Sequence, residues 1–439
     1  MFSNIAFEIA KKRGLLGKSV HLDTTSLSVE GEFQLPPEDG VIDINYGYSK
    51  DHRSDLKQFI VSLTVTGKAS VPLWVESLSG NTSDKTSFHN TIEKVRKFQE
   101  GLTQGQSFLW VADSALYHKE KLLGAQNLRW LTRVPETVKE CKDLVEQDEE
   151  SLNWTNLENG YRISRHFSDF GGVRQRWVLV FPQKAYEREK STAEKNLDKT
   201  EEQLALDLWH LENQVFKNIE SAQAKFDIII EKYPLHRIEV KFIEVDKYLG
   251  KGRPQKDARK EIGGYQVEVA TVIFESEKFE TLLNRKGRFV IGTNEIDDTE
   301  MSDEILLNEY KSQQDVERGF RFIKDPSFGV SDIFLKSPRR IMALTAIMTL
   351  CLMVYNIAQF EFRENLALQG SSIPNQLQKQ TSSPTLRWIF QLFQDIALVH
   401  IGGENSVVTN ITPLREHILG FFPLAVRQMY GRDAPTAHS

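Results

Sequence analysis

The sequence predicts a mixed α/β fold that carries a large inserted α+β domain. Strand and helix signals alternate along residues 19–134, the chain changes character over 135–287, and signals of the first kind return from 288. Hydrophobic residues make up 40% and charged residues 26% of the 439-residue chain. These values are ordinary for globular proteins and exclude the disordered, collagen-like and fibrous classes.

The first part of the predicted core spans residues 19–134, after a short N-terminal helix within 1–18. Alternating segments rich in β-branched residues predict an antiparallel meander. Two helices and two further strands follow it. The predicted elements are strands at 19–30, 57–67 and 71–78, a helix at 85–100, a strand at 107–113, a helix near 118–126 and a strand at 128–134.

The range 135–287 is predicted to be an inserted domain. Its polar helical stretch has a narrow apolar seam, and a second helix at 219–232 is expected to pack on it as a helical hairpin. The seam consists of Leu197, Leu204, Leu208, Leu211 and Val215. The second part of the core, 288–365, begins with a buried strand at 288–294 and continues with a helix at 303–324. Residues 366–439 are expected to form a linker, a C-terminal helical segment and a tail.

Charge and cysteine content narrow the function classes. The net charge of −6 excludes a basic signature over the whole chain, so any DNA surface must be local. Cys141 and Cys351 are the only cysteines, which excludes a disulfide framework and a cysteine-based zinc site and suits a reducing cytoplasm. The apolar run 341–358 is interrupted by polar residues and predicts a buried core helix, not a membrane span.

Three acidic residues are candidates for catalysis. Asp23 lies inside the first strand, Asp113 ends the apolar strand FLWVAD, and Glu317 lies on the 303–324 helix. Carboxylates from two neighbouring strands and a covering helix can hold the two Mg²⁺ ions that phosphodiester chemistry needs. Any one of these acids alone would more often be structural, because acids at strand ends are usually solvated or capping.

The 303–324 helix strengthens this interpretation. Tyr310, Gln313, Glu317 and Lys324 lie at offsets of 0, 3, 7 and 14, which places them on one stripe of a continuous helix. Arg318 and Arg321 flank the stripe. A solvated charged face would explain Lys324 alone, but less easily the whole ordered set.

These motifs resemble the insertion-sequence DDE transposases of the IS-four-like superfamily, whose signature is Y-x2-R-x3-E-x6-K. Here Gln313 replaces the arginine, and the other three positions match. The segments HLDTTS, SLSGNTSDKTSF, FLWVAD and SPTLRWIF are also similar to family sequences. The resemblance covers essentially the whole chain. It implies a ribonuclease-H-like mixed sheet flanked by helices, with the inserted domain between the fifth strand and the Glu-bearing helix.

The resemblance also implies roles for single residues. Asp23, Asp113 and Glu317 would bind two Mg²⁺ ions, with Mn²⁺ as a substitute, and catalyse cleavage of transposon ends and their transfer to target DNA. Tyr310 and Lys324 would position phosphates, and Gln313 could hydrogen-bond a phosphate without forming an arginine's charged fork. The implied partners are DNA and a second copy of the chain, in the bacterial cytoplasm at the nucleoid, with no membrane.

Two alternatives stay open beside an active transposase. Only 22 residues precede Asp23, where family members carry a DNA-binding domain, so we expect a truncated or mis-started chain. With Gln313, this favours a remnant that only binds DNA or full-length partners. A plain nuclease or phosphatase is disfavoured, because a tyrosine and a lysine at these offsets have no obvious place in it.

The remaining candidates are weaker. Helix capping is favoured for Asn81 and Asp84, and a structural turn for His52 and Asp55. The basic segments 251–260 and 336–340 are equally consistent with a solvated face and with DNA-backbone contacts. We expect Arg339 and Arg340 to gather near the acidic cluster together with the basic residues of the helix. The predicted core tryptophans are Trp110, Trp130 and Trp388.

Overall fold

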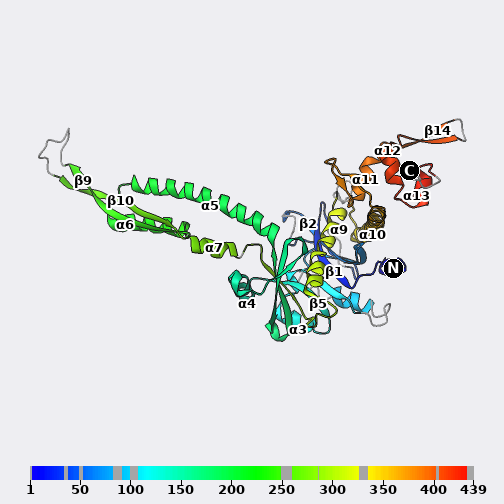
Figure 1. Ribbon diagram of the computed structural model, residues 1–439, viewed down its shortest axis with the longest axis horizontal. Coiled ribbons are helices and arrows are strands. Elements are labelled where there is room, and N and C mark those ends of the chain that lie inside the picture. Colours follow the sequence, from blue (N-terminus) through cyan, green and yellow to red (C-terminus); the bar gives the residue numbers. More distant parts are fainter. Residues whose placement is uncertain are drawn as a thin grey trace.

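A computed structural model shows an elongated molecule with a central sheet domain, a long arm and a C-terminal segment on the opposite side (Figure 1). It describes residues 2–33, 38–48, 53–82, 91–98, 107–248, 260–284, 286–325, 335–401 and 405–432. His52, Asp84 and nearly all of the basic segment 251–260 lie outside the described residues, so the interpretations given to them above stay predictions.

The central domain is built on one nine-stranded mixed sheet in the order β3-β2-β1-β4-β5-β11-β8-β7-β6. Strands β1, β4 and β5 are parallel, and β2, β3 and β11 are antiparallel to their neighbours. Helices flank this sheet, which confirms the predicted ribonuclease-H-like fold class. The strands are β1 Ser19–Val29, β2 Lys57–Thr66, β3 Val71–Ser79, β4 Leu109–Ala112, β5 Arg129–Val134, β6 Thr155–Leu157, β7 Tyr161–Ser168, β8 Gln175–Pro182 and β11 Phe289–Thr293.

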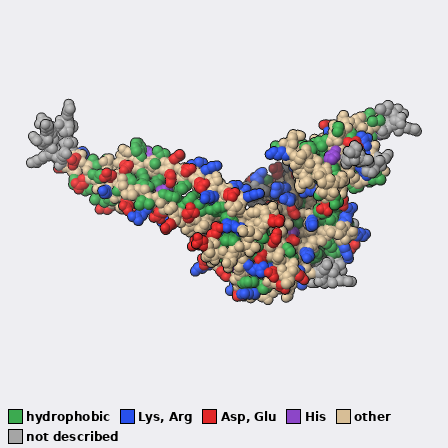
Figure 2. All heavy atoms as spheres, viewed as in Figure 1, with side chains coloured by type: hydrophobic (Ala, Val, Ile, Leu, Met, Phe, Trp, Pro, Cys, Tyr) green, Lys and Arg blue, Asp and Glu red, His purple; other side chains and the backbone are tan. Residues whose placement is uncertain are grey.

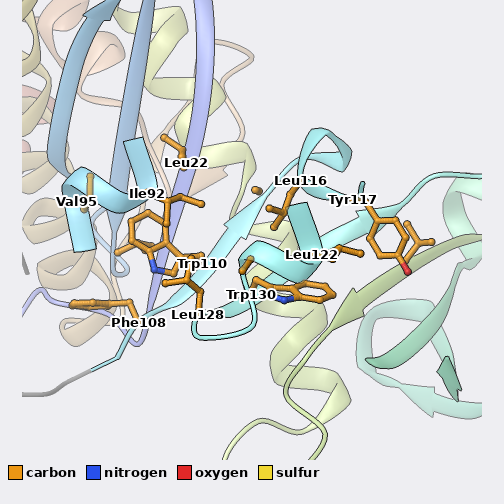
Figure 3. Close-up of a cluster of buried hydrophobic side chains, with 14 of the residues drawn as sticks. Leu22, Ile92, Val95, Phe108, Trp110, Leu116, Tyr117, Leu122, Leu128 and Trp130 are labelled. Atoms are coloured by element: carbon orange, nitrogen blue, oxygen red, sulfur yellow. The ribbon is translucent and has the colours of Figure 1, made fainter. Parts of the chain in front are cut away.

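Each face of the sheet is closed by its own apolar cluster. On one face Leu22, Trp110 and Trp130 pack with residues of α1 (Phe2–Lys12), the helix at 91–98 and α3 (Lys119–Gly124) (Figure 3). On the other face apolar side chains of β1 and β2 pack against α9 (Gln314–Ile323), and those of β4, β5 and β11 against α8 (Asp303–Lys311). Strand β4 is covered on both faces of the sheet, which explains why its sequence is continuously apolar.

Helix α10 (Pro338–Leu368) joins the central domain to the C-terminal segment. Its buried side chains belong to three clusters: Met353 packs with the first face of the sheet, Leu352 with the second, and Phe362 with the C-terminal segment. By length and composition α10 could cross a membrane, but 39% of its most apolar window is buried. Core helices pass the same test, and these contacts account for the apolar sequence.

The arm is smaller than the predicted insertion. Within 135–287, strands β6, β7 and β8 extend the central sheet, because β11 pairs along its whole length with β8. Only residues from Gln183 onward leave the sheet. Two helices of the arm cover a long two-stranded hairpin around a separate apolar cluster. The arm contains α5 Gln183–Glu212, α6 Ile219–Lys232, β9 His236–Tyr248, β10 Lys260–Phe274 and α7 Ser276–Asn284.

The C-terminal segment contains more helices and strands than the predicted linker, helical segment and tail. Short helices pack on the end of α10 through Phe362 and Leu366, and a β-hairpin projects from them. This segment contains β12 Ile373–Pro374, β13 Gln380–Thr381, α11 Leu386–Leu392, β14 Ala397–Ile401, β15 Asn405–Thr409, α12 Pro413–Leu419 and α13 Leu424–Met429. The remaining helix, α4 (Lys139–Val145), connects β5 to the outer strands.

Candidate active site

Two of the predicted catalytic acids lie side by side on adjacent central strands. Strands β1 and β4 run parallel with His21 opposite Val111. The paired register ends there; continuing it by two residues places Asp23 beside Asp113, whose backbone is still extended with φ −70° and ψ 177°. Adjacent strands are about 4.8 Å apart, so both carboxylates start from neighbouring backbone positions.

Arg133 extends this pair into a row of three. Strands β4 and β5 are parallel with Ala112 opposite Thr132, so the next step places Asp113 opposite Arg133. The Thr132 hydroxyl donates to the carbonyl of Asp113 at 2.6 Å, which holds the two strand ends together. Arg133 was not among the residues predicted from the sequence. It could have been recognised because it lies at the end of a central strand, directly after apolar residues, as Asp113 does.

The row faces helices α8 and α9. Asp23 pairs with Leu63 of β2, and the Leu63 side chain is buried in the cluster that contains Val316 of α9. Paired residues share a face of the sheet, so Asp23 lies on the α9 side. Val111 packs with Leu306 of α8, and alternation along the strand puts Asp113 on that same side.

The predicted 303–324 helix is two helices, because the chain tightens between α8 and α9. The amide N–H of Gln313 donates to the carbonyl of Tyr310, three residues back, and the Ser312 hydroxyl donates to the carbonyl of Asn308 at 3.0 Å. Both are interactions that compete with regular α-helical bonding. Ser312 and Gln313 keep right-handed helical backbone angles, so the four signature residues follow one interrupted helix instead of the continuous helix that was predicted.

The side chain of Gln313 forms a hydrogen bond within the protein. Its side-chain amide donates to the carbonyl of Leu22 at 3.0 Å, directly before Asp23. Its carbonyl oxygen Oε1 is buried and has no hydrogen-bond partner among the described residues. Gln313 therefore ties the α8–α9 turn to β1, and its amide N–H is already engaged where the sequence predicted a phosphate contact.

Tyr310 connects the helices to the row. Its half-buried ring lies 5.8 Å from the ring of Phe289, and the Arg133 guanidinium lies 5.5 Å from that same ring. Burial raises the pKa of the Tyr310 phenol; Arg133 opposes that shift, whereas the Asp113 and Glu317 carboxylates reinforce it. Tyr310 therefore lies within electrostatic range of Arg133, Asp113 and Glu317.

A small polar cluster fixes α8 over the beginning of β1. The Ser19 hydroxyl donates to the Glu309 carboxylate, and His21 Nε2 lies 3.7 Å from the same carboxylate. Ser19 Oγ and His21 Nε2 are 3.1 Å apart. Burial opposes ionisation of Glu309, but hydrogen bonds from His21 and Ser19 outweigh it and lower the pKa of Glu309. Ser19 and His21 share the face of Asp23, so this cluster positions the helices, two residues away from the first acid.

Gly319 lets α9 approach the sheet closely. A Cβ atom on Gly319 would lie 3.1 Å from Cδ2 of Leu63 and 3.1 Å from Cδ2 of Leu352. Ordinary contacts between carbon atoms are about 3.5–4.0 Å, so only glycine fits without displacement. Because Leu63 pairs with Asp23, the absence of a side chain at Gly319 lets the helix that carries Glu317 pack closely against the strands beside Asp23.

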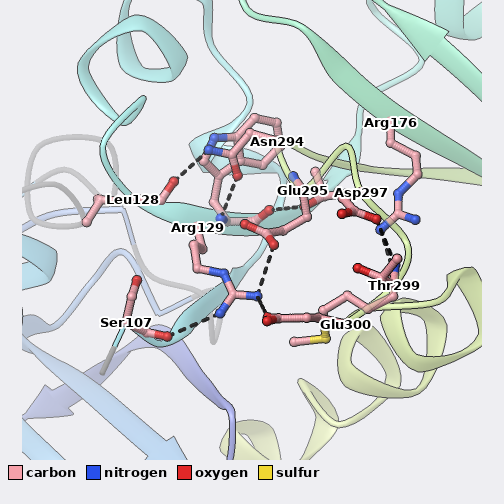
Figure 4. Close-up of polar contacts among 12 residues, drawn as sticks. Ser107, Leu128, Arg129, Arg176, Asn294, Glu295, Asp297, Thr299 and Glu300 are labelled. Atoms are coloured by element: carbon pink, nitrogen blue, oxygen red, sulfur yellow. Dashed lines mark hydrogen bonds and ion pairs between the residues drawn. The ribbon is translucent and has the colours of Figure 1, made fainter. Parts of the chain in front are cut away.

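The start of α8 is held by polar contacts along the loop after β11 (Figure 4). Asn294 accepts from the Trp130 amide at 2.9 Å and donates to the Leu128 carbonyl at 2.7 Å. Fully buried Arg176 donates to the Met301 carbonyl at 2.7 Å. Its guanidinium also lies 3.4 Å from Asp303, the first residue of α8. These contacts attach the loop to β5 and β8 and orient the helix that carries Tyr310.

The other predicted DNA-binding residues lie along α9 and at the start of α10. Arg318 pairs with Asp315 at 2.8 Å, Arg321 is exposed, and Lys324 ends the helix. Arg339 pairs with Glu38. Arg340 is exposed on α10.

The structure also describes the contacts and burial of two weaker candidates and of the three predicted core tryptophans. Asp55 pairs with Arg53 at 2.8 Å on the surface, and Asn81 is exposed. Trp110 and Trp130 are core residues, which confirms their prediction. Trp388 is partly buried and donates from Nε1 to the carbonyl of Pro374 at 2.9 Å.

The donor chemistry of the three acids fits a divalent cation, because Mg²⁺ and Mn²⁺ prefer hard oxygen ligands. Within the part of the chain that the structure describes, however, no group of three acidic, His or Cys side chains is arranged to hold a metal ion. The Asp113 carboxylate accepts from the Ala115 amide at 3.0 Å, and the Asp23 carboxylate from the Thr24 amide at 2.7 Å. The acids are aligned on one face but do not form a closed ligand set.

A ribonuclease-H-like sheet with acids at neighbouring positions of two central strands and a third acid on the covering helix is typical of nucleic-acid-processing domains. Residues 20–357 match the family model described as the transposase DDE domain, so the chain belongs to that family. This confirms the resemblance to DDE transposases. Members of the family use divalent metal ions.

Individual known proteins resemble this chain only weakly. No curated protein matches the chain. Among solved structures, a piggyBac transposase synaptic complex with hairpin DNA is similar at 8% sequence identity and a TM-score of 0.35. The match covers 96% of this chain and 59% of the piggyBac chain, so this chain spans a little over half the length of that relative.

Proposed function

We propose that this protein is a transposase that cleaves DNA at transposon ends and joins the free 3′-hydroxyl to target DNA. The observation that carries the proposal is the row of Asp23, Asp113 and Arg133 on one sheet face, with Glu317 on the helix above it. Family membership supports the same activity. From the family resemblance we also propose a homodimer in the DNA complex and action in the bacterial cytoplasm.

The three acids would hold two Mg²⁺ ions, which when bound supply a nucleophile and stabilise the leaving oxygen. Mg²⁺ in proteins is commonly bound by one or two carboxylates plus substrate phosphates. This suits acids that are aligned but do not close a ligand set. The scissile phosphate of DNA would then complete the site.

The neighbouring residues would hold that phosphate. Arg133 offers a guanidinium beside Asp113, and such a planar fork can donate two hydrogen bonds to one phosphate. A tyrosine phenol is protonated at neutral pH, and burial raises the pKa of Tyr310 further, so it can donate to a phosphate oxygen. Gln313 stands where the family signature has an arginine, and its side chain is hydrogen-bonded to β1. Arg133 would therefore supply the positive charge for the phosphate.

The test is cleavage of a labelled duplex that carries the sequences flanking the gene, with Mg²⁺ and the full chain. Glu317→Gln keeps the shape of the side chain but removes the charge that binds the cation. We expect loss of cleavage with unchanged folding and DNA binding, whereas the control Glu304→Gln, at an exposed acid on α8, should cleave normally. Wild-type cleavage by Glu317→Gln would refute the assignment.

Two observations favour a second function. Gln313 is engaged with β1 and the acids do not close a ligand set in the described structure. Both would suit a remnant that binds DNA or full-length copies without cutting. A parent protein that binds duplex DNA but does not cleave it with Mg²⁺ or Mn²⁺ would establish this second function.

A further inference from the structure

A groove of about 680 Å³ lies beyond the acidic row, between α9, α10, α11 and the turn that joins β2 to β3. Figure 2 shows Lys and Arg side chains around the hollow where the C-terminal segment meets the central domain. The cationic residues that line the groove are Lys68, Arg318, Arg321, Arg363 and Arg387. Among the described residues its lining includes two acids, Asp315 and Asp325.

Both acids form ion pairs with arginines that line the groove. Asp315 pairs with Arg318 at 2.8 Å, and Asp325 pairs with Arg387. Within the described residues, no carboxylate forms an ion pair with Lys68, Arg321 or Arg363. These two ion pairs leave the groove with three positive charges in excess, although the whole chain carries a net charge of −6.

Arg363 is the most informative of the three. Its side chain is half-buried on α10, and its Nε donates to the carbonyl of Pro384 at 2.8 Å, which leaves both terminal nitrogens for another acceptor. Burial lowers the pKa of the Arg363 guanidinium, and the nearby Arg318 acts in the same direction. An arginine stays charged in proteins, so this cation is held against both burial and repulsion. An anion in the groove would relieve that cost.

The groove continues from the active site along α9. Arg321 follows Glu317 by four residues, so it lies on nearly the same side of the helix and about 6 Å further along its axis. The groove therefore lies within one helical turn of the third acid, because Arg318 and Arg321 both line it. A polymer with regularly spaced anionic groups can reach from the row into the groove, whereas a single small anion cannot span both.

We propose that this groove binds the phosphodiester backbone of the DNA duplex as it leaves the acidic row. The proposal rests on the proposed function, because it extends the path of the same DNA. Its contacts are with phosphates, so binding here is independent of base sequence. Lys68, Arg321 and Arg363 are the residues that make them.

The test uses the full chain and a fluorescently labelled duplex of random sequence, with affinity measured over a series of KCl concentrations. Each lost phosphate contact should reduce the slope of log affinity against log salt by about 0.9. We expect this reduction for Lys68→Gln and Arg321→Gln singly, and roughly twice that for the pair. The matched control is Lys11→Gln with Arg174→Gln, two exposed cations outside the groove that remove the same charge.

Arg363→Gln should lower the slope too, and Arg363→Lys, which keeps the charge, should retain it. If Arg363→Gln fails to fold, the exposed pair Lys68 and Arg321 carries the test. A parental slope in the groove variants, or an equal loss in the control pair, would overturn the proposal. The two failures are distinguishable: a parent that binds and cleaves DNA while its groove variants keep its slope refutes the groove alone, and a parent without salt-dependent DNA binding refutes the proposed function as well.

Discussion

Replacing Gly319 by alanine should separate catalysis from folding. The added Cβ would lie 3.1 Å from Cδ2 of Leu63 and from Cδ2 of Leu352. The optimum between carbon atoms is about 3.5–4.0 Å. Leu63 and Leu352 are both buried, so we expect α9 to move away from the sheet by a few tenths of an ångström. Glu317, two residues earlier, moves with it, away from Asp23.

The effect on stability should be small, because two contributions oppose each other. Alanine is favoured over glycine in a helix by about 1 kcal/mol. Overpacking of a buried contact costs about 1–3 kcal/mol. The free energy of unfolding should therefore fall by roughly 0–2 kcal/mol, which urea denaturation can measure.

The effect on cleavage should be measurable in the rate. A displacement of about 1 Å at a catalytic group can cost about 100-fold in rate, so a shift of a few tenths of an ångström should slow single-turnover cleavage roughly 3- to 10-fold. DNA affinity should change little, since phosphate contacts do not depend on the spacing between Glu317 and Asp23. Adding Leu63→Val and Leu352→Val removes both clashing atoms and should restore part of the rate. Parental cleavage by Gly319→Ala, or no recovery in the triple variant, would refute this account of the helix spacing.

Three further predictions concern other parts of the molecule. Asp303→Asn leaves the fully buried Arg176 without its acid, so urea denaturation should show a loss of about 3–5 kcal/mol; a loss below about 1 kcal/mol would contradict the role of this pair in holding α8. Burial raises the pKa of the Cys141 thiol to about 12, so at pH 8 a thiol reagent should modify one cysteine in the native protein and none in Cys351→Ser. Calorimetry should show tighter Mn²⁺ binding with duplex DNA present than without it, because the acids do not close a ligand set; equal affinity would mean that DNA phosphates contribute no ligands.

The sequence was informative where a local pattern is sufficient. Runs of β-branched and apolar residues predicted the central strands, and Asp113 was recognisable because it directly follows one of them. The signature spacing identified the family before any fold was known. The same local signals failed at Ser312, where a side-chain hydrogen bond to the Asn308 carbonyl helps to divide a predicted helix in two.

Strand register and the approach of α9 were decided only by the tertiary structure. Nothing in the residues around Arg133 says that it lies beside Asp113, since this follows from how β4 and β5 align. The role of Gln313 likewise depends on a carbonyl 291 residues away in the chain. The size of the arm was also misjudged, because an outer strand of a sheet and a strand of an inserted domain have the same local pattern. Sequence carries the chemistry of each side chain and its local periodicity, whereas the pairing of distant strands and the packing of a glycine against two leucines arise only when the chain is folded.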